Sequence, residues 1–243
     1  MTRAVLFDLD DTLFDHRQCA RRALADVHQG HELFRVQPFG AFERTHADLL
    51  EELHVRVLAG ALGLEEARRE RFRRLFEAYG VVQDIHAVAL AASRYREGYQ
   101  RARGPVPGAA GLLALVRSRA RVAIVSNNLL EEQREKLRHC GLDPWVDALV
   151  VSEEAGVSKP APRIFAIALE RLGCSAREAV MVGDSWAADV IGARGAGLRA
   201  VWFNPLGHPR PGPLTGVTEL HTLDPPGEAL ATIFTGAGTP PGQ

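Results

Sequence analysis

Lysine is almost absent from this chain of 243 residues. Of 29 basic side chains only Lys136 and Lys159 are lysines, and the others are arginines. Each lysine is therefore a position to inspect for a specific role. The net charge is also close to zero, at −1. A chain without a strong positive excess has no general attraction for nucleic acid or for an anionic membrane surface, so we expect neither as a partner.

Cysteines are few, and no long apolar run is present. The three cysteines, Cys19, Cys140 and Cys174, are far apart and odd in number. They form neither a disulfide framework nor a metal-binding spacing, which favours a reducing compartment. No stretch has the length and apolarity of a membrane span, and we expect no signal peptide because the first apolar run begins almost at the N-terminus. The expected location is the cytoplasm.

What the sequence does contain is a series of short apolar runs, each followed by a polar residue. The runs are 4–7, 122–125, 148–151, 179–182 and 199–203, and the polar residues are Asp8, Ser126, Ser152, Asp184 and Asn204. From residue 104 onward the runs alternate with amphipathic helical stretches. This pattern predicts an α/β fold with a doubly wound parallel sheet, to which 217–221 adds an edge strand. Ligands of such sheets bind at the carboxyl ends of the strands, where the polar residues lie.

Residues 15–103 have a different, purely helical pattern. Apolar residues at helical spacing predict helices over 15–29, 39–62, 64–79 and 84–103. We therefore predict a helical cap at 15–103, inserted into a Rossmann-like core made of 1–14 and 104–235. The tail 236–243, rich in Gly and Pro, is expected to be disordered.

Two features of the cap are expected to lie on its surface. The basic run Arg68–Arg74 is interleaved with glutamates, which indicates a solvated helix face with ion pairs one turn apart. His28 and His31 are three residues apart, but no further metal ligand is near in sequence, and we expect surface histidines.

The first apolar run ends in the acidic stretch Asp8-Leu9-Asp10-Asp11-Thr12. Carboxylates gathered in a dry site repel one another unless a cation neutralises them, which makes this stretch a candidate cation site. Alternatively, it is a turn whose Asp and Thr side chains cap a helix.

Three further patterns follow at later strand ends. They are Ser126-Asn127, Lys159-Pro160, and Gly183-Asp184-Ser185 with Asp189. Together with the acidic stretch, they resemble the motifs of the haloacid dehalogenase superfamily, in its phosphatase branch with a helical cap inserted after the first strand. Within that branch, 7–15 and 151–160 resemble the pyrimidine 5′-nucleotidase and N-acylneuraminate-9-phosphatase-like groups.

The resemblance implies a role for each matching residue. Asp8 would be the nucleophile that forms an aspartyl-phosphate, and Asp10 the general acid and base. Lys159 would supply positive charge, and Thr12, Ser126 and Asn127 would bind the phosphoryl group. The implied cofactor is Mg²⁺, held by Asp8, Asp184 and the backbone carbonyl of Asp10.

For three of these residues the sequence also allows a simpler interpretation. Asp189 could orient metal-bound water or Lys159, or it could merely complement a helix dipole. Lys159 could be a surface residue at a helix entry, and Ser126 a turn residue.

The predicted function is Mg²⁺-dependent hydrolysis of a small phosphorylated metabolite, a nucleoside monophosphate or a sugar phosphate. A phosphomutase, a 2-haloacid dehalogenase and a catalytically silent regulatory protein are the alternatives. The intact set Asp8, Asp10 and Asp184 argues against the last two. Phe14 and His16 either touch the substrate or pack between core and cap. Substrate choice is expected to depend on the cap, and the sequence gives no indication of oligomeric state.

Overall fold

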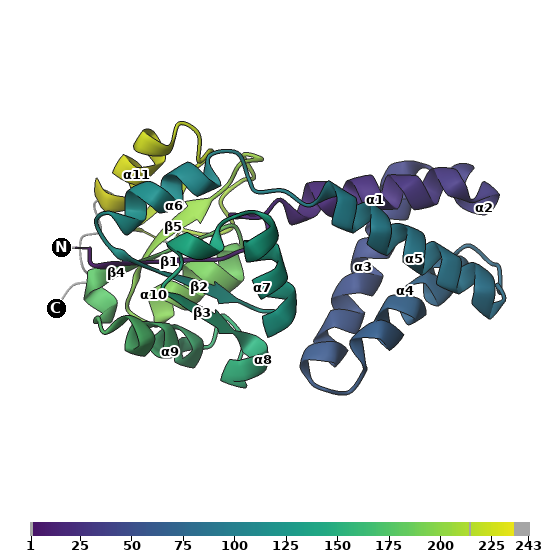
Figure 1. Ribbon diagram of the computed structural model, residues 1–243, viewed down its shortest axis with the longest axis horizontal. Helices are drawn as coiled ribbons and strands as arrows, with labels where there is room; N and C mark the ends of the chain where they lie inside the picture. The colour runs from purple at the N-terminus through teal and green to yellow at the C-terminus, as the bar shows by residue number, and fades with distance from the viewer. Residues whose placement is uncertain (1, 214, 236–243) are drawn as a thin grey trace. The chain divides into compact units, whose positions relative to one another are not determined.

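The chain divides into two compact units in the computed structural model, which describes residues 2–213 and 215–235. The first unit combines the residues up to Asp15 with those from Gly104 onward, and the second consists of His16–Arg103 (Figure 1). The tail 236–243, which we expect to be disordered, lies outside the described residues.

Six strands of the described residues form one parallel sheet in the first unit, in the order β3-β2-β1-β4-β5-β6. The chain runs from β1 outward through β2 and β3, then returns to β4 on the other side of β1. The switch in strand order therefore lies between β1 and β4, where ligand sites of such sheets form. The predicted doubly wound parallel sheet is confirmed, with its edge strand. The strands are β1 (Ala4–Phe7), β2 (Arg121–Ser126), β3 (Ala148–Val151), β4 (Ala179–Gly183), β5 (Arg199–Phe203) and β6 (Val217–Leu220).

The central strand β1 is apolar at every position because helices cover both faces of the sheet. All four of its residues are fully buried. Ala4 and Leu6 pack in one core cluster with Ile164 and Phe165. The alternate residues of the strand point to the opposite face.

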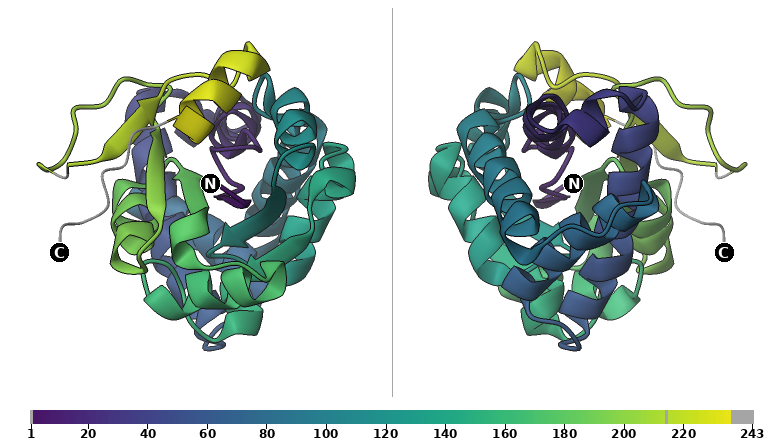
Figure 2. Two further views of the ribbon diagram at one scale, coloured as in Figure 1. Left: turned by 90° about the vertical axis from the view of Figure 1, so that its left-hand side faces the viewer. Right: turned by 90° about the vertical axis from the view of Figure 1, so that its right-hand side faces the viewer.

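Helices lie on both faces of this sheet (Figures 1 and 2). One face carries α6 (Ala109–Arg117) and α11 (Pro226–Thr235), and the other carries α9 (Pro162–Leu172) and α10 (Gly192–Gly195). The sequence analysis missed α11, although Pro226 in its first turn and the buried Ala229, Leu230 and Ile233 are helix signals. The remaining elements are α7 (Leu130–His139), α8 (Ser152–Ala155) and the 3₁₀ turns Asp143–Trp145 and Ala176–Glu178.

The segment after β4, where the alternation of strands and helices predicts a helix, is not a regular α-helix. Trp186–Ile191 forms a π-helical turn, and α10 follows it for only one turn. The Ser185 side chain caps this segment by accepting the N–H of Ala188 at 3.2 Å. Single π-helical turns are frequent at functional sites.

The second unit is helical throughout its regular elements, as predicted, and a short helix α2 is added. Its core contains the fully buried rings of Phe34, Phe42, Phe72 and Phe76. None of the helices in the described part of the chain has the length and apolarity of a membrane span. The helices are α1 (His16–Gly30), α2 (Glu32–Arg35), α3 (Phe39–Leu58), α4 (Leu64–Ala78) and α5 (Ile85–Ala102).

The expectation of a surface position is wrong for His28. Its side chain is buried, its Nε2 donates to the carbonyl of Gln37 at 2.9 Å, and its ring packs against Phe39 and Phe42. His28 lies four residues after the buried Leu24, on the inner face of α1. His28 thus contacts a backbone carbonyl and two aromatic rings. The other histidine of the pair, His31, is half-buried.

The expectation for the basic run is wrong for Arg71 alone. Arg73 pairs with Glu70 and Glu77, as expected for an exposed face. Arg71 is only 7% exposed, because it continues the inner stripe of α4 that begins at Ala67.

Candidate active site

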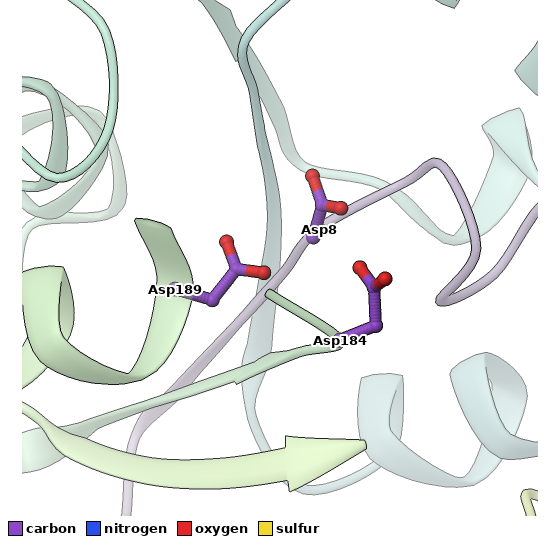
Figure 3. A group of neighbouring side chains, drawn as sticks. All are labelled: Asp8, Asp184 and Asp189. Atoms are coloured by element: carbon purple, nitrogen blue, oxygen red, sulfur yellow. The ribbon is translucent and has the colours of Figure 1, made fainter. Parts of the chain in front are cut away.

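The carboxyl ends of β1 and β4 bring two carboxylates together. The strands pair in parallel at Phe7 and Val182, so that Asp8 and Asp184 follow at the same edge of the sheet. Asp189, from the π-helical turn, faces them (Figure 3). One carboxylate oxygen from each of Asp8, Asp184 and Asp189 lies within 4.8 Å of the other two. The structure therefore joins the carboxylate of the stretch after β1 to the two carboxylates of the stretch after β4.

A glycine allows Asp189 to lie this close to β4. A Cβ atom added at Gly183 would lie 2.3 Å from Asp189 Oδ2. That oxygen accepts the backbone N–H of Ser185 at 3.0 Å, and Oδ1 accepts from Lys159 Nζ at 2.7 Å. The Asp189 carboxylate thus binds the start of the turn and the lysine at once.

Lys159 is buried between two of the carboxylates. Its Nζ donates to Asp8 Oδ1 at 2.6 Å as well as to Asp189. Burial lowers the pKa of Lys159, but the carboxylates of Asp189 and Asp8 more than reverse this, and the pKa lies above its ordinary value. Burial raises the pKa of Asp8, and Lys159 opposes that shift while Asp189 and Asp184 add to it. The lysine is therefore a charged group inside an acidic site, and the alternative of a surface residue is excluded.

Asn127 fixes the backbone that carries this lysine. Its Nδ2 donates to the carbonyl of Lys159 at 2.9 Å, and its Oδ1 accepts the N–H of Lys159 at 2.7 Å. The Asn127 side chain thus binds both the backbone N–H and the backbone carbonyl of Lys159. Ser126 is buried, and its hydroxyl accepts from Gln133 Nε2 at 2.8 Å.

The turn after Asp8 is tight and internally bonded. Asp11 has a φ of 59°, a left-handed conformation that Asp tolerates better than most residues. Thr12 is fully buried, and its hydroxyl accepts the backbone N–H of Asp184 at 3.1 Å. Thr12 thus links the loop after β1 to the end of β4.

The side chain of Asp10 does not join the three carboxylates. Its Oδ1 accepts from Lys136 Nζ at 2.6 Å, and its Oδ2 accepts from Gln133 Nε2 at 2.8 Å and Asn128 Nδ2 at 3.2 Å. A metal contact from Asp10 would therefore have to use its backbone carbonyl, as the family resemblance implies.

Lys136 and Gln133 are site residues that the sequence analysis missed. Both lie on α7, three residues apart, and both are buried. The one sequence feature that could have indicated Lys136 is the rarity of lysine, because the chain contains only two. Gln133 gave no signal beyond its place on the same helical face as Lys136.

Comparison with known proteins identifies the family of this chain. The model of the haloacid dehalogenase-like hydrolases matches residues 2–197. The chain belongs to the haloacid dehalogenase-like hydrolase family. The predicted resemblance is confirmed, and the protein is a hydrolase of that family.

Three relatives illustrate the range of similarity. This hydrolase is 34% identical over 212 residues to a ribulose-1,5-bisphosphate 5-phosphatase of Halopiger xanaduensis, with coverage of 84% of this chain and 86% of the relative. It is 40% identical over 124 residues to the pyrimidine 5′-nucleotidase YjjG of Escherichia coli, with coverage of 49% and 55%. The magnesium-bound structure of the HAD-hydrolase YfnB from Bacillus subtilis matches with a TM-score of 0.72 at 27% identity, with coverage of 94% and 98%.

The residues of the acidic site fit a divalent cation. Asp8, Asp184 and Asp189 carry more negative charge than Lys159 balances, and all are oxygen donors of the kind that Mg²⁺ binds. Both oxygens of Asp189 already bind protein donors. Asp8 and Asp184 are therefore the better candidates for direct ligands.

Proposed function

We propose that this hydrolase is a Mg²⁺-dependent phosphatase that transfers the phosphoryl group of a small phosphomonoester first to Asp8 and then to water. The main support is the position of Lys159 between Asp8 and Asp189, with Asp184 beside them. A carboxylate that attacks a phosphate dianion meets strong repulsion, and a buried fixed cation reduces it. Relatives that are named as phosphatases or nucleotidases add further support.

In the first step, a carboxylate oxygen of Asp8 attacks phosphorus while the bond from phosphorus to the leaving oxygen breaks. Asp10, in its protonated form, donates its proton to that oxygen, and the alcohol departs. In the second step a water molecule attacks the aspartyl-phosphate at phosphorus and gives a proton to Asp10. The bond between phosphorus and the Asp8 oxygen breaks, which releases inorganic phosphate and restores both side chains.

The remaining side chains position these groups. Lys159 orients the Asp8 carboxylate and stabilises negative charge on it, and Asp189 and Asn127 hold Lys159 in place. Asp8, Asp184 and the carbonyl of Asp10 would hold the Mg²⁺, which supplies positive charge to the phosphoryl oxygens when bound. The Ser126 hydroxyl, which accepts from Gln133, would donate its hydrogen to the phosphoryl group.

Asp10 and Asp184 distinguish this reaction from dehalogenation on the same fold. A dehalogenase of this family attacks carbon and requires neither an acid at the position of Asp10 nor a metal. Here Asp10 is held by three donor side chains and Asp184 faces Asp8, which favours phosphoryl transfer.

The first experiment tests the nucleophile and the metal. Purified protein is assayed for phosphate release from p-nitrophenyl phosphate with Mg²⁺ and with EDTA. We expect activity only with Mg²⁺ and its loss in Asp8→Asn, whose lack of deamidation is checked by mass spectrometry. Asp11→Asn is the matched control, because it removes a neighbouring carboxylate at a left-handed position that Asn tolerates. Full activity in EDTA, or in Asp8→Asn, would contradict the proposal.

The second experiment tests the substrate class. Nucleoside 5′-monophosphates, sugar phosphates, O-phosphoserine and a phosphoserine peptide are compared by kcat/KM. The last two have the same leaving group, so their ratio isolates the effect of substrate size. We expect a small metabolite to be preferred over the peptide. Preference for the peptide would exclude a small-molecule phosphatase, and isomerisation of a sugar phosphate without phosphate release would indicate a mutase.

A further inference from the structure

A cavity of about 440 Å³ lies at the amino ends of the strands, on the edge of the sheet opposite to the acidic site. Four arginines line it: Arg3 directly before β1, Arg117 at the end of α6, Arg119 in the loop that follows, and Arg121 at the start of β2. From Arg3 the chain passes through β1 to Asp8, five residues that span about 16 Å at 3.3 Å per residue. The cavity is therefore separate from the candidate active site.

Hydrogen bonds between the strand ends bring two of these arginines together. The backbone N–H of Arg121 donates to the carbonyl of Arg3 at 2.9 Å, which places the two residues side by side. Cys174, two residues after the end of α9, also lines the cavity. Burial, and secondarily Glu178, raises the pKa of the Cys174 thiol, whereas Arg3 and Arg121 oppose this rise. The positive charges of both arginines thus act at one point of the cavity wall.

The positive charge of the cavity is only partly balanced. Arg3 and Arg117 each form an ion pair with a carboxylate, at 3.1 Å and 2.8 Å. Among the residues that the structure describes, neither Arg119 nor Arg121 forms an ion pair, and none of those that line the cavity is acidic. Because the net charge of the whole chain is −1, this excess of positive charge is local.

A structural role explains only part of this arrangement. Cations are favourable at the carboxyl end of a helix, and Arg121 Nη1 donates to the carbonyl of Leu172 in the last turn of α9 at 3.4 Å. An arginine has five N–H donors, so this one long contact leaves the other donors of Arg121 available. For the side chain of Arg119, the described part of the chain offers no such contact. The two unbalanced arginines are therefore not accounted for by the helix end.

The chemistry of the cavity favours an anion with several linked phosphate groups. A concave surface with charge of one sign concentrates ions of the opposite sign. Guanidinium groups match phosphate oxygens through pairs of parallel N–H donors. The volume lies in the range of small-molecule sites and exceeds what a single phosphate ion fills. A chain of phosphates would use both the size of the cavity and the separate arginines on its wall.

We propose that this cavity binds a small polyanion with linked phosphate groups, held by Arg119 and Arg121 and by the remaining N–H donors of Arg3 and Arg117. A free polyphosphate and the triphosphate of a nucleotide offer the same chemistry. Because the cavity lies at the other edge of the sheet from Asp8, its occupant is not the phosphomonoester that undergoes hydrolysis. The inference thus goes beyond the proposed reaction and does not depend on it.

The site is tested first by binding. Tripolyphosphate and ATP are titrated calorimetrically, in EDTA and about 0.15 M salt, into the parent protein, Arg119→Met, Arg121→Met and Arg177→Met. Arg177 is exposed at the same edge of the sheet and does not line the cavity, so its variant is the matched control. We expect each cavity variant to bind about 10- to 100-fold more weakly, the scale of losing a hydrogen bond to a charged group, and the control to bind as the parent does.

The two ligands distinguish the sources of the phosphate chain. Equal affinities would show that the chain alone is recognised, and tighter binding of ATP would show that the nucleoside also contacts the cavity. Both results support the site. If the parent binds neither ligand, if both cavity variants bind as the parent does, or if Arg177→Met is weakened equally, the proposal is wrong. Arg119 is exposed in a loop, so its replacement should leave the fold intact, which thermal unfolding of each variant checks.

Cys174 provides a second readout that requires no substitution. It is half-buried, as is Cys140, which does not line the cavity. The parent protein is treated with iodoacetamide with and without tripolyphosphate, and alkylation of each cysteine is followed by mass spectrometry. We expect the ligand to slow alkylation of Cys174 and not of Cys140, because it covers the thiol and neutralises arginines that favour the reactive thiolate. Protection of neither cysteine, or equal protection of both, would overturn the proposal.

Discussion

At the scale of single residues, each of the two lysines is paired with a different aspartate of the loop after β1. Lys159 donates to Asp8 and Lys136 to Asp10, both at 2.6 Å. The sequence indicates Lys159 as a candidate site residue because it lies in the family motif that includes Pro160. The contact of Lys136 could not be predicted, because it joins residues 126 positions apart and depends on how α7 packs beside the sheet.

The contacts of Asp10 lead to a prediction about leaving groups. Lys136 and Gln133 position the Asp10 carboxyl group, and misplacing a catalytic group by about 1 Å can reduce a rate about 100-fold. We expect Lys136→Met and Gln133→Leu to lower kcat more for an alkyl phosphate than for p-nitrophenyl phosphate, whose leaving group needs little protonation. Arg134→Met, an exposed change on the same helix, is the control. Equal losses for both substrates would exclude a role in proton transfer to the leaving oxygen.

A second prediction at this scale concerns Gly183. Its replacement by Ala would place a Cβ atom 2.3 Å from Asp189 Oδ2, so the carboxylate must move and Lys159 loses a well-placed partner. We expect Gly183→Ala to lower stability by about 1–3 kcal/mol, as overpacking does, and to lower kcat about 100-fold. Gly227→Ala is the control because no atom lies within 4 Å of the added carbon. Denaturant titration and kinetics of both variants check this, and normal kcat in Gly183→Ala would show that Asp189 tolerates displacement.

At the scale of elements, apolar spacing predicted the long helices but not the shorter and irregular ones. The π-helical turn Trp186–Ile191 has no characteristic apolar spacing in the sequence, and its Asp189 packs closely against Gly183. The glutamates interleaved with the basic run predict a surface position for Arg71. Its position, four residues after the buried Ala67 and four before the buried Leu75, correctly indicates the inner face of α4.

The burial of His46 between helices predicts acid sensitivity of the fold. Burial, and secondarily Arg71, lowers the pKa of His46 well below its ordinary value of 6.5. Below about pH 6.5 the unfolded chain therefore takes up a proton that the folded chain does not, and stability falls with decreasing pH by at most about 1.4 kcal/mol per unit. We expect His46→Gln to flatten this dependence in denaturant titrations between pH 5 and pH 7. His86→Gln removes an exposed histidine of the same unit and should leave it unaltered; equal slopes in both variants would contradict the assignment.

At the scale of the whole molecule, short continuous apolar runs predicted the sheet and the positions of its strand ends. Strands that are buried on both faces are apolar at successive positions and lack the alternating pattern of half-buried strands. The same runs place Asp8 and Asp184 at one edge of the sheet. The sequence could not define the ion pairs among the residues at that edge, since these depend on side chains brought together from β1, α7, the loop before α9 and the turn after β4. Tertiary packing of these four segments therefore determines the detailed chemistry.

Because the acidic site joins distant segments of the core, cation binding should stabilise the folded chain as a whole. Under the proposed function, Mg²⁺ would bind the carboxylates gathered in the folded state and not the dispersed carboxylates of the unfolded chain, so a concentration 100 times the Kd would add about 2.7 kcal/mol to the free energy of unfolding. For a chain of this length we expect a rise of the thermal midpoint by roughly 5–10 °C. Asp184→Asn should raise the midpoint without Mg²⁺, because one repulsive charge is removed, and should lose most of the response to Mg²⁺. Asp143→Asn, an exposed change outside the site, is the control. Calorimetry of the three proteins over a series of Mg²⁺ concentrations checks the prediction, and an unaltered Mg²⁺ response in Asp184→Asn would remove Asp184 from the proposed ligand set.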